Sequence, residues 1–178
     1  MKEVSKHEIY RLLEERYERV SIDYVLLLLE EPYDGEATHK KAIIKAFDIL
    51  AERFGVEYTL EPEKMHAERC EAEELLMPPE DVYYETRRQT DRSYTAPKPL
   101  PYWYAFLEPP HGTPYRSEDF TEFQKVLLPN REALEAYRWN DDFSDYFDAG
   151  KEWWGTGLWT IYDKIEGLMI VIGASLTD

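Results

Sequence analysis

Hydrophobic residues recur at helical spacing in two stretches near the start of the chain. The first follows Ser5 and Glu8, which have the spacing of a capping box. The second lies between Thr38 and Phe54 and is followed by Gly55, which suits the end of a helix. We expect a helix in each stretch. The apolar run 22–29 between them also favours a helix, because it is rich in leucine and contains no glycine.

Three later segments carry helix signals of other kinds. Two have residues that favour a helix start, and the third places aromatic side chains on one helical face and aspartates on the opposite face. The expected helices are residues 63–76, which follow Pro62; residues 117–127, which Ser117 begins; and residues 139–150, which end at Gly150.

Runs of aromatic and β-branched residues predict strands in the second half of the chain. Residues 102–107 predict one strand, bounded by prolines. Residues 134–139 fit a strand or a helix equally well. Residues 158–162 and 168–174 flank a short polar segment that ends in glycine, which is typical of an antiparallel hairpin. The second of these runs is apolar on both faces, so we expect it at the centre of a sheet.

The composition changes near residue 77. Of the 26 aromatic residues, only 7 lie before that point, and nine of the eleven prolines lie between Pro78 and Pro129. We therefore expect a helical N-terminal region, 1–77, and an aromatic-rich α+β region, 78–178, which can pack as a single domain. The predicted fold class is α+β: a helical N-terminal region packed with a small antiparallel sheet that carries a C-terminal β-hairpin.

The chain is acidic throughout, with a net charge of −16. Such a charge repels nucleic acid and anionic membranes and attracts basic proteins. Cys70 is the only cysteine, so an intramolecular disulfide is excluded, and the longest aliphatic run is too short to cross a bilayer. We expect a cytoplasmic protein, with no nucleic-acid or membrane partner and no cofactor.

Aspartates and tryptophans near residue 150 are candidates for a site. The aspartate face of segment 139–150, which includes Asp145, is either a solvated surface or a cation site. Trp153 and Trp154 either fill a core or form a stacking platform for a sugar, a base or a peptide. If they form a platform, Glu152 is placed to act on its ligand.

Two other local patterns suggest chemistry. His111, in a loop with glycine and proline, is the best single candidate for a general base. Arg87 and Arg88 belong to a locally basic segment that either grips an anion or balances the aspartate face, and we favour the second interpretation. His66, Cys70 and Glu73 or Glu74 would share one face of the expected 63–76 helix, which is too weak a pattern to predict a metal site.

The sequence yields two functional hypotheses. The leading one is a small acidic binding protein that neutralises or escorts a basic protein partner, because charge and tryptophans are present without a catalytic motif. The alternative is a hydrolase or metal-dependent enzyme for a small polar ligand such as a sugar, with catalytic candidates His111, Asp145 and Glu152 beside the tryptophans.

Overall fold

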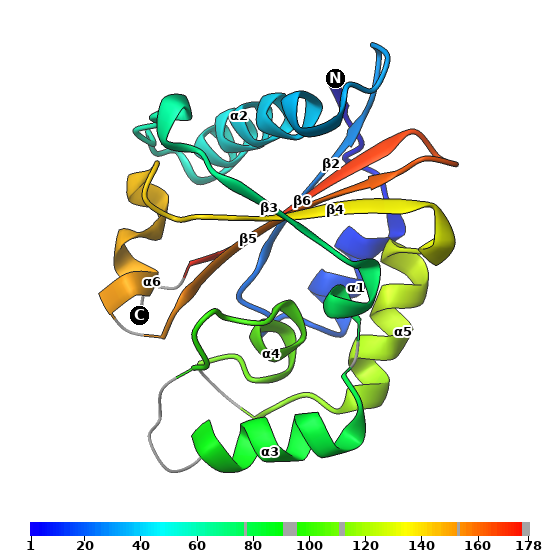
Figure 1. Ribbon diagram of the computed structural model, residues 1–178, viewed down its shortest axis with the longest axis vertical. Coiled ribbons are helices and arrows are strands. Elements are labelled where there is room, and N and C mark those ends of the chain that lie inside the picture. The colour runs from blue at the N-terminus through cyan, green and yellow to red at the C-terminus, as the bar shows by residue number, and fades with distance from the viewer. Residues whose placement is uncertain (77, 91–95, 111–112, 153, 176–178) are drawn as a thin grey trace.

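A six-stranded antiparallel sheet forms the centre of the molecule (Figure 1). The computed structural model describes residues 1–76, 78–90, 96–110, 113–152 and 154–175. The strand order is β1-β2-β6-β5-β4-β3, and every neighbouring pair is antiparallel. The strands are β1 (Lys2–Glu3), β2 (Asp23–Leu28), β3 (Ala67–Cys70), β4 (Leu134–Trp139), β5 (Thr156–Asp163) and β6 (Leu168–Ser175).

Helices cover both faces of this sheet. The longest, α2, lies along one face, here called the upper face, and shorter helices lie below the other (Figure 1). The α-helices are α1 (Glu8–Glu15), α2 (Gly35–Phe54), α3 (Glu80–Thr90), α4 (Tyr102–Leu107), α5 (Ser117–Leu127) and α6 (Asp148–Glu152). The 3-10 helices are η1 (Pro62–Lys64), η2 (Ala72–Leu75), η3 (Arg131–Ala133) and η4 (Asp145–Phe147).

The predicted C-terminal hairpin and the α+β class are confirmed. Strands β5 and β6 pair from Thr156↔Ser175 to Asp163↔Leu168, and all residues of β6 except the last are buried. β6 lies between β2 and β5, so it is central, as its apolar character on both faces requires. Gly55 ends α2 with a left-handed φ of 67°, as predicted. Residues 134–139, which fitted either element, form a strand.

The prediction of a helix at residues 22–29 is wrong, because most of this run is strand β2. Leucine favours a helix in an isolated segment, but this run pairs with β1 on one side and β6 on the other. Tyr24, Val25, Leu26 and Leu27 are all buried, and their side chains alternate between the two cores. Backbone pairing within a doubly covered sheet therefore outweighs the local preference.

Residues 102–107 are also misassigned by the sequence, since they form helix α4. All six side chains are buried, so the segment shows no alternation, and a short apolar run does not distinguish a strand from a buried helix. Pro101 precedes the helix, where its missing N–H leaves no hydrogen bond unmade, and its carbonyl accepts from the Ala105 amide at 3.0 Å.

The expected helices at 63–76 and 139–150 are each replaced by shorter elements. Residues 63–76 contain η1, the edge strand β3 and η2, because the chain leaves its first turn to pair with β4. Residues 139–150 begin at the end of β4, pass through a loop and re-enter helix only at η4 and α6. Gly150 is a buried residue within α6, not its terminator, so the aspartates do not form one helical face.

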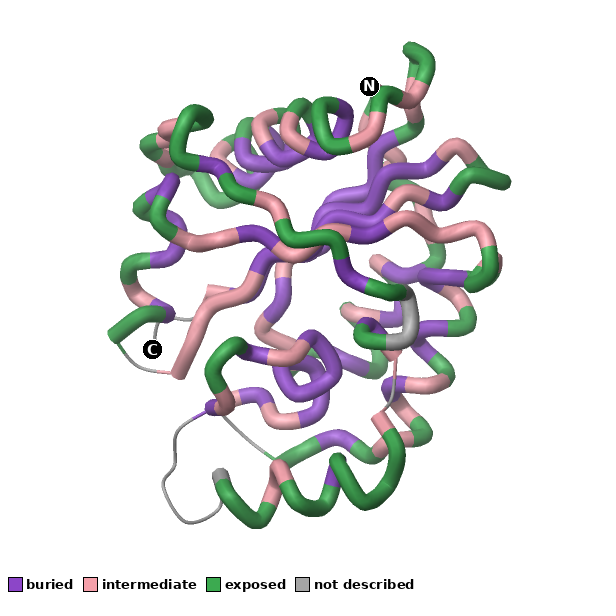
Figure 2. Tube along the Cα trace, in the orientation of Figure 1, coloured by how far each residue is buried: buried purple, intermediate pink, exposed green. Residues whose placement is uncertain are grey.

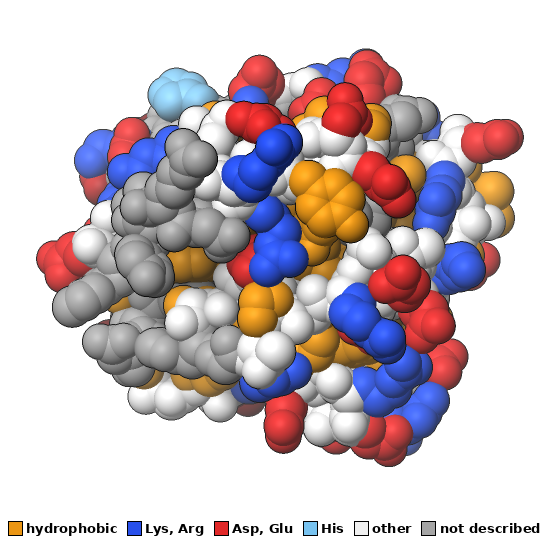
Figure 3. Space-filling model, turned by 90° about the horizontal axis from the view of Figure 1, so that it is seen from below, with side chains coloured by type: hydrophobic (Ala, Val, Ile, Leu, Met, Phe, Trp, Pro, Cys, Tyr) orange, Lys and Arg blue, Asp and Glu red, His pale blue; other side chains and the backbone are white. Residues whose placement is uncertain are grey.

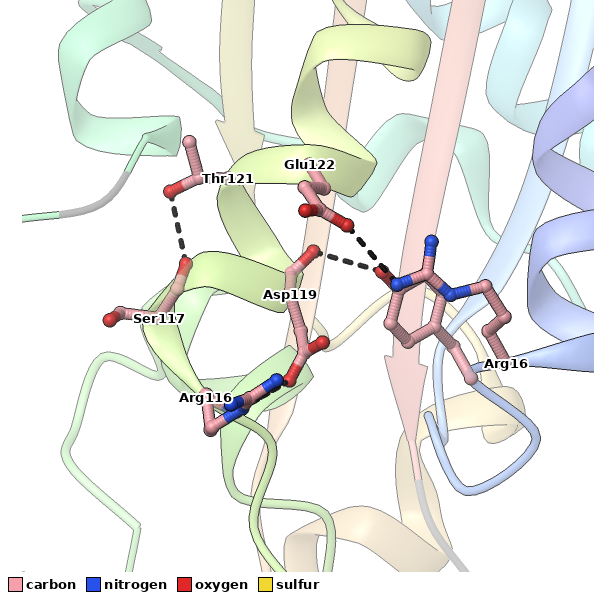
Figure 4. Close-up of polar contacts among 7 residues, drawn as sticks. Arg16, Arg116, Ser117, Asp119, Thr121 and Glu122 are labelled. Atoms are coloured by element: carbon pink, nitrogen blue, oxygen red, sulfur yellow. Dashed lines mark hydrogen bonds and ion pairs between the residues drawn. The ribbon is translucent and has the colours of Figure 1, made fainter.

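Helices α1 and α5 form where predicted and pack against each other. The α1 cap is His7, whose Nδ1 accepts from the Ile9 amide at 3.3 Å, so the expected Ser5 capping box is wrong. Arg16, at the end of α1, pairs with Glu122 of α5 at 3.1 Å (Figure 4). The hydroxyl of the neighbouring Tyr17 donates to the Asp119 carbonyl at 3.3 Å. These contacts fix α1 beside α5.

The sheet separates two hydrophobic cores. The upper core lies between α2 and the sheet, and the lower core lies between the sheet and α1, α4 and α5; buried residues concentrate at the centre of the sheet (Figure 2). Strands β1, β2 and β3 come from residues 1–77 and strands β4, β5 and β6 from residues 78–178. Both segments therefore contribute to one sheet, and the first is not purely helical.

Candidate ligand-binding groove

Two adjoining cavities lie below the sheet, at the β3 and β4 edge. The first is about 720 Å³ and the second about 400 Å³, and they share Pro99, Leu100 and Arg138 in their walls. We call them together the edge groove. The first cavity is also lined by residues 66–68, 97–98, 139–141, 151–152 and 154–157, and the second by residues 70, 74–76, 78–79, 101–103 and 159. Four segments distant in sequence therefore converge on it.

Arg138 lies at the junction of the two cavities because of the strand register. It pairs across the ladder with Glu68 on one side and Trp159 on the other. Side chains alternate along a strand, and Cys70 and Trp159 belong to the lower core, so Glu68 and Arg138 also face down. The Arg138 guanidinium contacts the Glu68 carboxylate at 2.5 Å and is about one-third exposed.

The far wall of the first cavity is built by the chain that leaves α6. The Trp154 ring stacks on Tyr104 of the lower core, with centroids 6.3 Å apart and an interplanar angle of 27°. Gly155 has a φ of 142° and approaches Ala96 and Leu100, so a glycine is required there for the backbone conformation. Thr156 donates a short hydrogen bond to the Asp141 carboxylate. Trp154 therefore presents a partly buried, anchored ring to the groove.

The charges of the first cavity are mixed. Three cationic side chains and three carboxylates line it: Lys98, Arg138 and Lys151, and Glu68, Asp141 and Glu152. Arg138 is paired with Glu68, and Lys151 lies 3.8 Å from Asp142 and 3.9 Å from Asp148. The negative charge of the whole chain is therefore not concentrated in the first cavity. This cavity suits a ligand that carries both positively and negatively charged groups. In the view from below, the described part of the surface likewise mixes basic, acidic and hydrophobic side chains (Figure 3).

The second cavity is mainly apolar. Leu75, Leu76, Trp103 and several prolines line it, and Cys70 borders it. Burial raises the pKa of the Cys70 thiol to about 11, and the nearby charge of Glu74 acts in the same direction. The thiol is therefore protonated at neutral pH and is a poor nucleophile.

The edge groove lies beside an open strand edge. The His66 carbonyl accepts from the Asn140 amide at 3.2 Å, which makes this a hydrogen-bonded pair. Because such pairs alternate in an antiparallel ladder, the amide and carbonyl groups of Ala67 and Arg69 point away from β4. β3 is the last strand of the sheet within the described residues, so these groups face outward.

The structure brings together only part of the predicted site. Glu152 and Trp154 line the edge groove, whereas Asp145 lies elsewhere and accepts from the Thr59 amide at 2.9 Å. Arg87 pairs with Glu108 at 2.6 Å, and the exposed Arg88 pairs with Glu85 at 2.8 Å. His111 and Trp153 lie outside the described residues.

His66 and Cys70 are not neighbours on a helix. His66 precedes β3 and lines the first cavity, whereas Cys70 is the last residue of β3 and lines the second. The part of the chain that the structure describes holds no group of three or more histidine, cysteine, aspartate or glutamate side chains arranged to hold a metal ion. It also contains no helix with the length and apolar character needed to span a bilayer.

Arg138 was not among the residues that the sequence predicted for a site. A charged residue between Tyr137 and Trp139 in an otherwise half-buried strand is a signal that could have identified Arg138. Lys98 belongs to the locally basic segment that contains Arg87 and Arg88, and it lines the edge groove although those two arginines do not. No protein-family model matches the chain, and no curated protein or solved structure matches it either.

Proposed function

We propose that this protein is a cytoplasmic binding protein that takes up an extended segment of a basic partner protein along the open edge of β3. The observation that carries the proposal is the position of this edge directly beside the two cavities of the edge groove. An added strand would bond to the outward backbone groups of Ala67 and Arg69. Its alternate side chains would point down into the edge groove.

The two cavities suggest which side chains the segment carries. The apolar second cavity, with Leu75 and Trp103, suits an aliphatic or aromatic residue. The first cavity offers the Trp154 ring and carboxylates such as Glu152, which suit a polar or basic residue. The net charge of −16 adds long-range attraction for a basic protein and makes the association sensitive to salt.

The test uses proline substitutions at the two sheet edges. Proline removes an amide donor, and Ala67→Pro removes one that faces outward while leaving the β4 ladder intact. Glu3→Pro is the matched control, because Val4 donates to the Leu26 carbonyl and so the Glu3 amide points away from β2 at the opposite edge. We expect the native chain and Glu3→Pro to retain a basic partner at low salt, and Ala67→Pro to lose it.

Amide exchange supplies a readout at residue level. Binding should slow hydrogen exchange at the amides of Ala67 and Arg69, and Trp154→Ala should weaken capture about tenfold or more. Equal capture by Ala67→Pro and the native chain, or unchanged exchange at both amides, would contradict strand addition. Recovery of no partner at low salt would contradict the binding function itself.

A second candidate function is an enzyme that acts on a small polar ligand such as a sugar. It is favoured by one observation: the carboxylates of Asp141 and Glu152 share a cavity with Trp154. Metal analysis of the purified protein, with thermal shifts against divalent cations and soluble oligosaccharides, tests it. Stabilisation by a sugar that Glu152→Gln retains and Trp154→Ala loses would favour recognition without catalysis. Turnover that Glu152→Gln abolishes would favour the enzyme.

A further inference from the structure

A separate cavity of about 480 Å³ lies on the upper face, where β2 begins and α2 ends. Its walls include Asp23, Phe54, Tyr58, Asp145, Tyr146 and Ser175. We call it the Asp23 pocket. It shares no lining residue with the edge groove, and no lysine or arginine lines it among the described residues. Its electrostatic character is therefore distinct from the mixed charge of the edge groove.

The Asp23 carboxylate has a hydrogen-bond donor but no cationic partner in the described chain. Its Oδ2 accepts from the Tyr146 hydroxyl at 2.7 Å, and its Oδ1 makes no hydrogen bond there. Arg53 is the nearest basic influence, but its guanidinium donates to the Tyr24 carbonyl and to Glu3. Burial raises the pKa of Asp23, while the Tyr146 hydrogen bond and Arg53 oppose the rise. A half-buried carboxylate of this kind is stabilised by a cation that reaches it.

Aromatic rings line the Asp23 pocket beside this carboxylate. The Tyr58 and Tyr146 rings meet edge to face, with centroids 5.4 Å apart, and Phe54 at the rim is 50 % exposed. Asp145 places a second carboxylate in the same wall, and the Thr59 amide holds it in position. The Ser175 hydroxyl is buried without a hydrogen-bond partner in the described chain and can accept or donate one.

We propose that the Asp23 pocket binds an organic ammonium ion. The ammonium group would lie on the free Oδ1 of Asp23, and the attached carbon skeleton would lie against Tyr58, Tyr146 and Phe54. Aromatic faces and an unpaired carboxylate both attract a cation, whereas two carboxylates repel an anion. The same aminoalkyl chemistry is offered by a free amine and by a lysine side chain of a protein. This proposal stands independently of strand addition at β3.

Titration of the full chain with benzylammonium tests the proposal by NMR or calorimetry. Benzyl alcohol and benzoate are neutral and anionic probes of similar shape, and both should bind at least tenfold more weakly. Asp23→Asn keeps an acceptor for the Tyr146 hydroxyl and removes the charge, so it should weaken benzylammonium binding at least tenfold. Asp142→Asn is the matched control, because Asp142 is exposed, outside the pocket, and should leave binding unchanged.

Two further ligands identify the source of the ammonium group, and a second variant keeps the test valid if Asp23→Asn does not fold. Butylammonium and Nα-acetyl-lysinamide compare a free amine with a peptide-borne one, and the tighter binder identifies the source. Phe54→Ala removes a half-exposed ring and should weaken benzylammonium binding even if Asp23→Asn fails to fold. Equal binding of benzylammonium and benzyl alcohol by the native chain, or unchanged binding by a folded Asp23→Asn, would overturn the proposal.

Discussion

The two faces of the sheet are covered in different ways. On the upper face, a single helix of 20 residues, α2, spans the strands and is joined to them by a chain of directional hydrogen bonds. On the lower face, the shorter helices α1, α4 and α5 fill the core mainly with aromatic rings. A helix of six residues such as α4 is only about 9 Å long, so it leaves the β3 and β4 edge uncovered. The edge groove lies at that edge.

The hydrogen-bond chain of the upper face has one consistent direction. The Trp139 indole N–H donates to the Thr160 hydroxyl at 2.8 Å, and the Tyr33 hydroxyl donates to Glu135 at 2.7 Å. Because the Tyr33 hydroxyl proton goes to Glu135, His39 Nε2–H donates to the Tyr33 oxygen at 2.9 Å. In the neutral ring His39 Nδ1 is then an acceptor, and it accepts the Thr160 hydroxyl proton at 2.7 Å. This fixes the neutral tautomer of a histidine that is fully buried.

The lower core has a shorter polar chain within a larger set of rings. Tyr102 exchanges a hydrogen bond with Tyr24 at 3.0 Å and accepts from Gln124 at 2.8 Å. Around it, Phe106 contacts Tyr17, Tyr115, Phe120 and Phe123 with centroids 5.0 to 5.7 Å apart. Directional bonding therefore fixes the register of α2 on the upper face, and ring packing holds together several short elements on the lower face.

Removing a ring from the lower core should have the largest effect on stability. Phe106 is fully buried, so Phe106→Ala should lower the free energy of unfolding by about 3–5 kcal/mol. The matched control is Phe54→Ala, where half of the side chain is exposed and the loss should be below about 1 kcal/mol. Urea denaturation measures both. Equal losses would contradict the conclusion that packing holds the lower face together.

Protonation of His39, in the hydrogen-bond chain of the upper face, should destabilise the protein between pH 6.5 and 4. Burial lowers the pKa of His39 to about 4, so in this range the unfolded chain binds a proton that the folded chain does not. Stability should therefore fall as the pH falls, by up to about 3 kcal/mol in total.

The contribution of His39 can be isolated by comparison with His39→Gln. Other groups with shifted pKa values, including His7 and Asp23, titrate in both proteins and are removed when the two curves are subtracted. The free energy of unfolding, measured by denaturation at each pH and plotted against pH, should have a different slope in the two proteins between pH 6.5 and 4. Parallel curves would show that His39 does not titrate as its burial requires.

The hydroxyl of Tyr102, in the lower core, should contribute less to the free energy of unfolding than the Phe106 ring or the neutral His39. Tyr102→Phe keeps the ring but leaves Tyr24 and Gln124 each without a buried partner, so we expect a loss of about 1–3 kcal/mol. Tyr24→Phe in the same background should recover part of that loss, because it removes one of the unpaired groups. A double-mutant cycle measures this coupling, and full additivity would contradict the shared hydrogen bond.

The smallest effect concerns the single thiol. Because burial raises the pKa of Cys70 to about 11, alkylation by iodoacetamide at pH 7.5 should be slower than that of a free cysteine, and should accelerate as the pH rises. A ligand bound in the second cavity of the edge groove, which Cys70 borders, should slow alkylation further. Labelling followed by intact-mass measurement checks both, and alkylation at the rate of free cysteine would contradict burial of this side chain.

The elements predicted correctly are those with a strong local signal. The 38–54 helix has many turns of amphipathic spacing and a terminating glycine, and the hairpin has two apolar runs with a turn between them. Residues 22–29 and 102–107 are short apolar runs without periodicity, so their structure depends on which neighbours they meet. Strand pairing decided the structure of the first run and burial on all sides decided that of the second, and a local pattern carries no information about either.

The site was predictable only in part for the same reason. Trp154 and Glu152 were found because they are adjacent in sequence, and they do line one cavity. Asp145, a few residues earlier, lines the Asp23 pocket instead, because the chain turns through η4 before it reaches Glu152. Arg138 and Lys98 reach the edge groove through strand register and the proline segment, and neither relation is visible without the fold.

The strand order also has a consequence for synthesis on the ribosome. β2 pairs along its length with β6, which follows the other five strands of this sheet in the sequence. Until β6 leaves the exit tunnel, β2 lacks its central neighbour and both hydrophobic layers remain open to water. The nascent chain therefore completes this core only after translation of β6, and until then it exposes surface of the kind that chaperones bind.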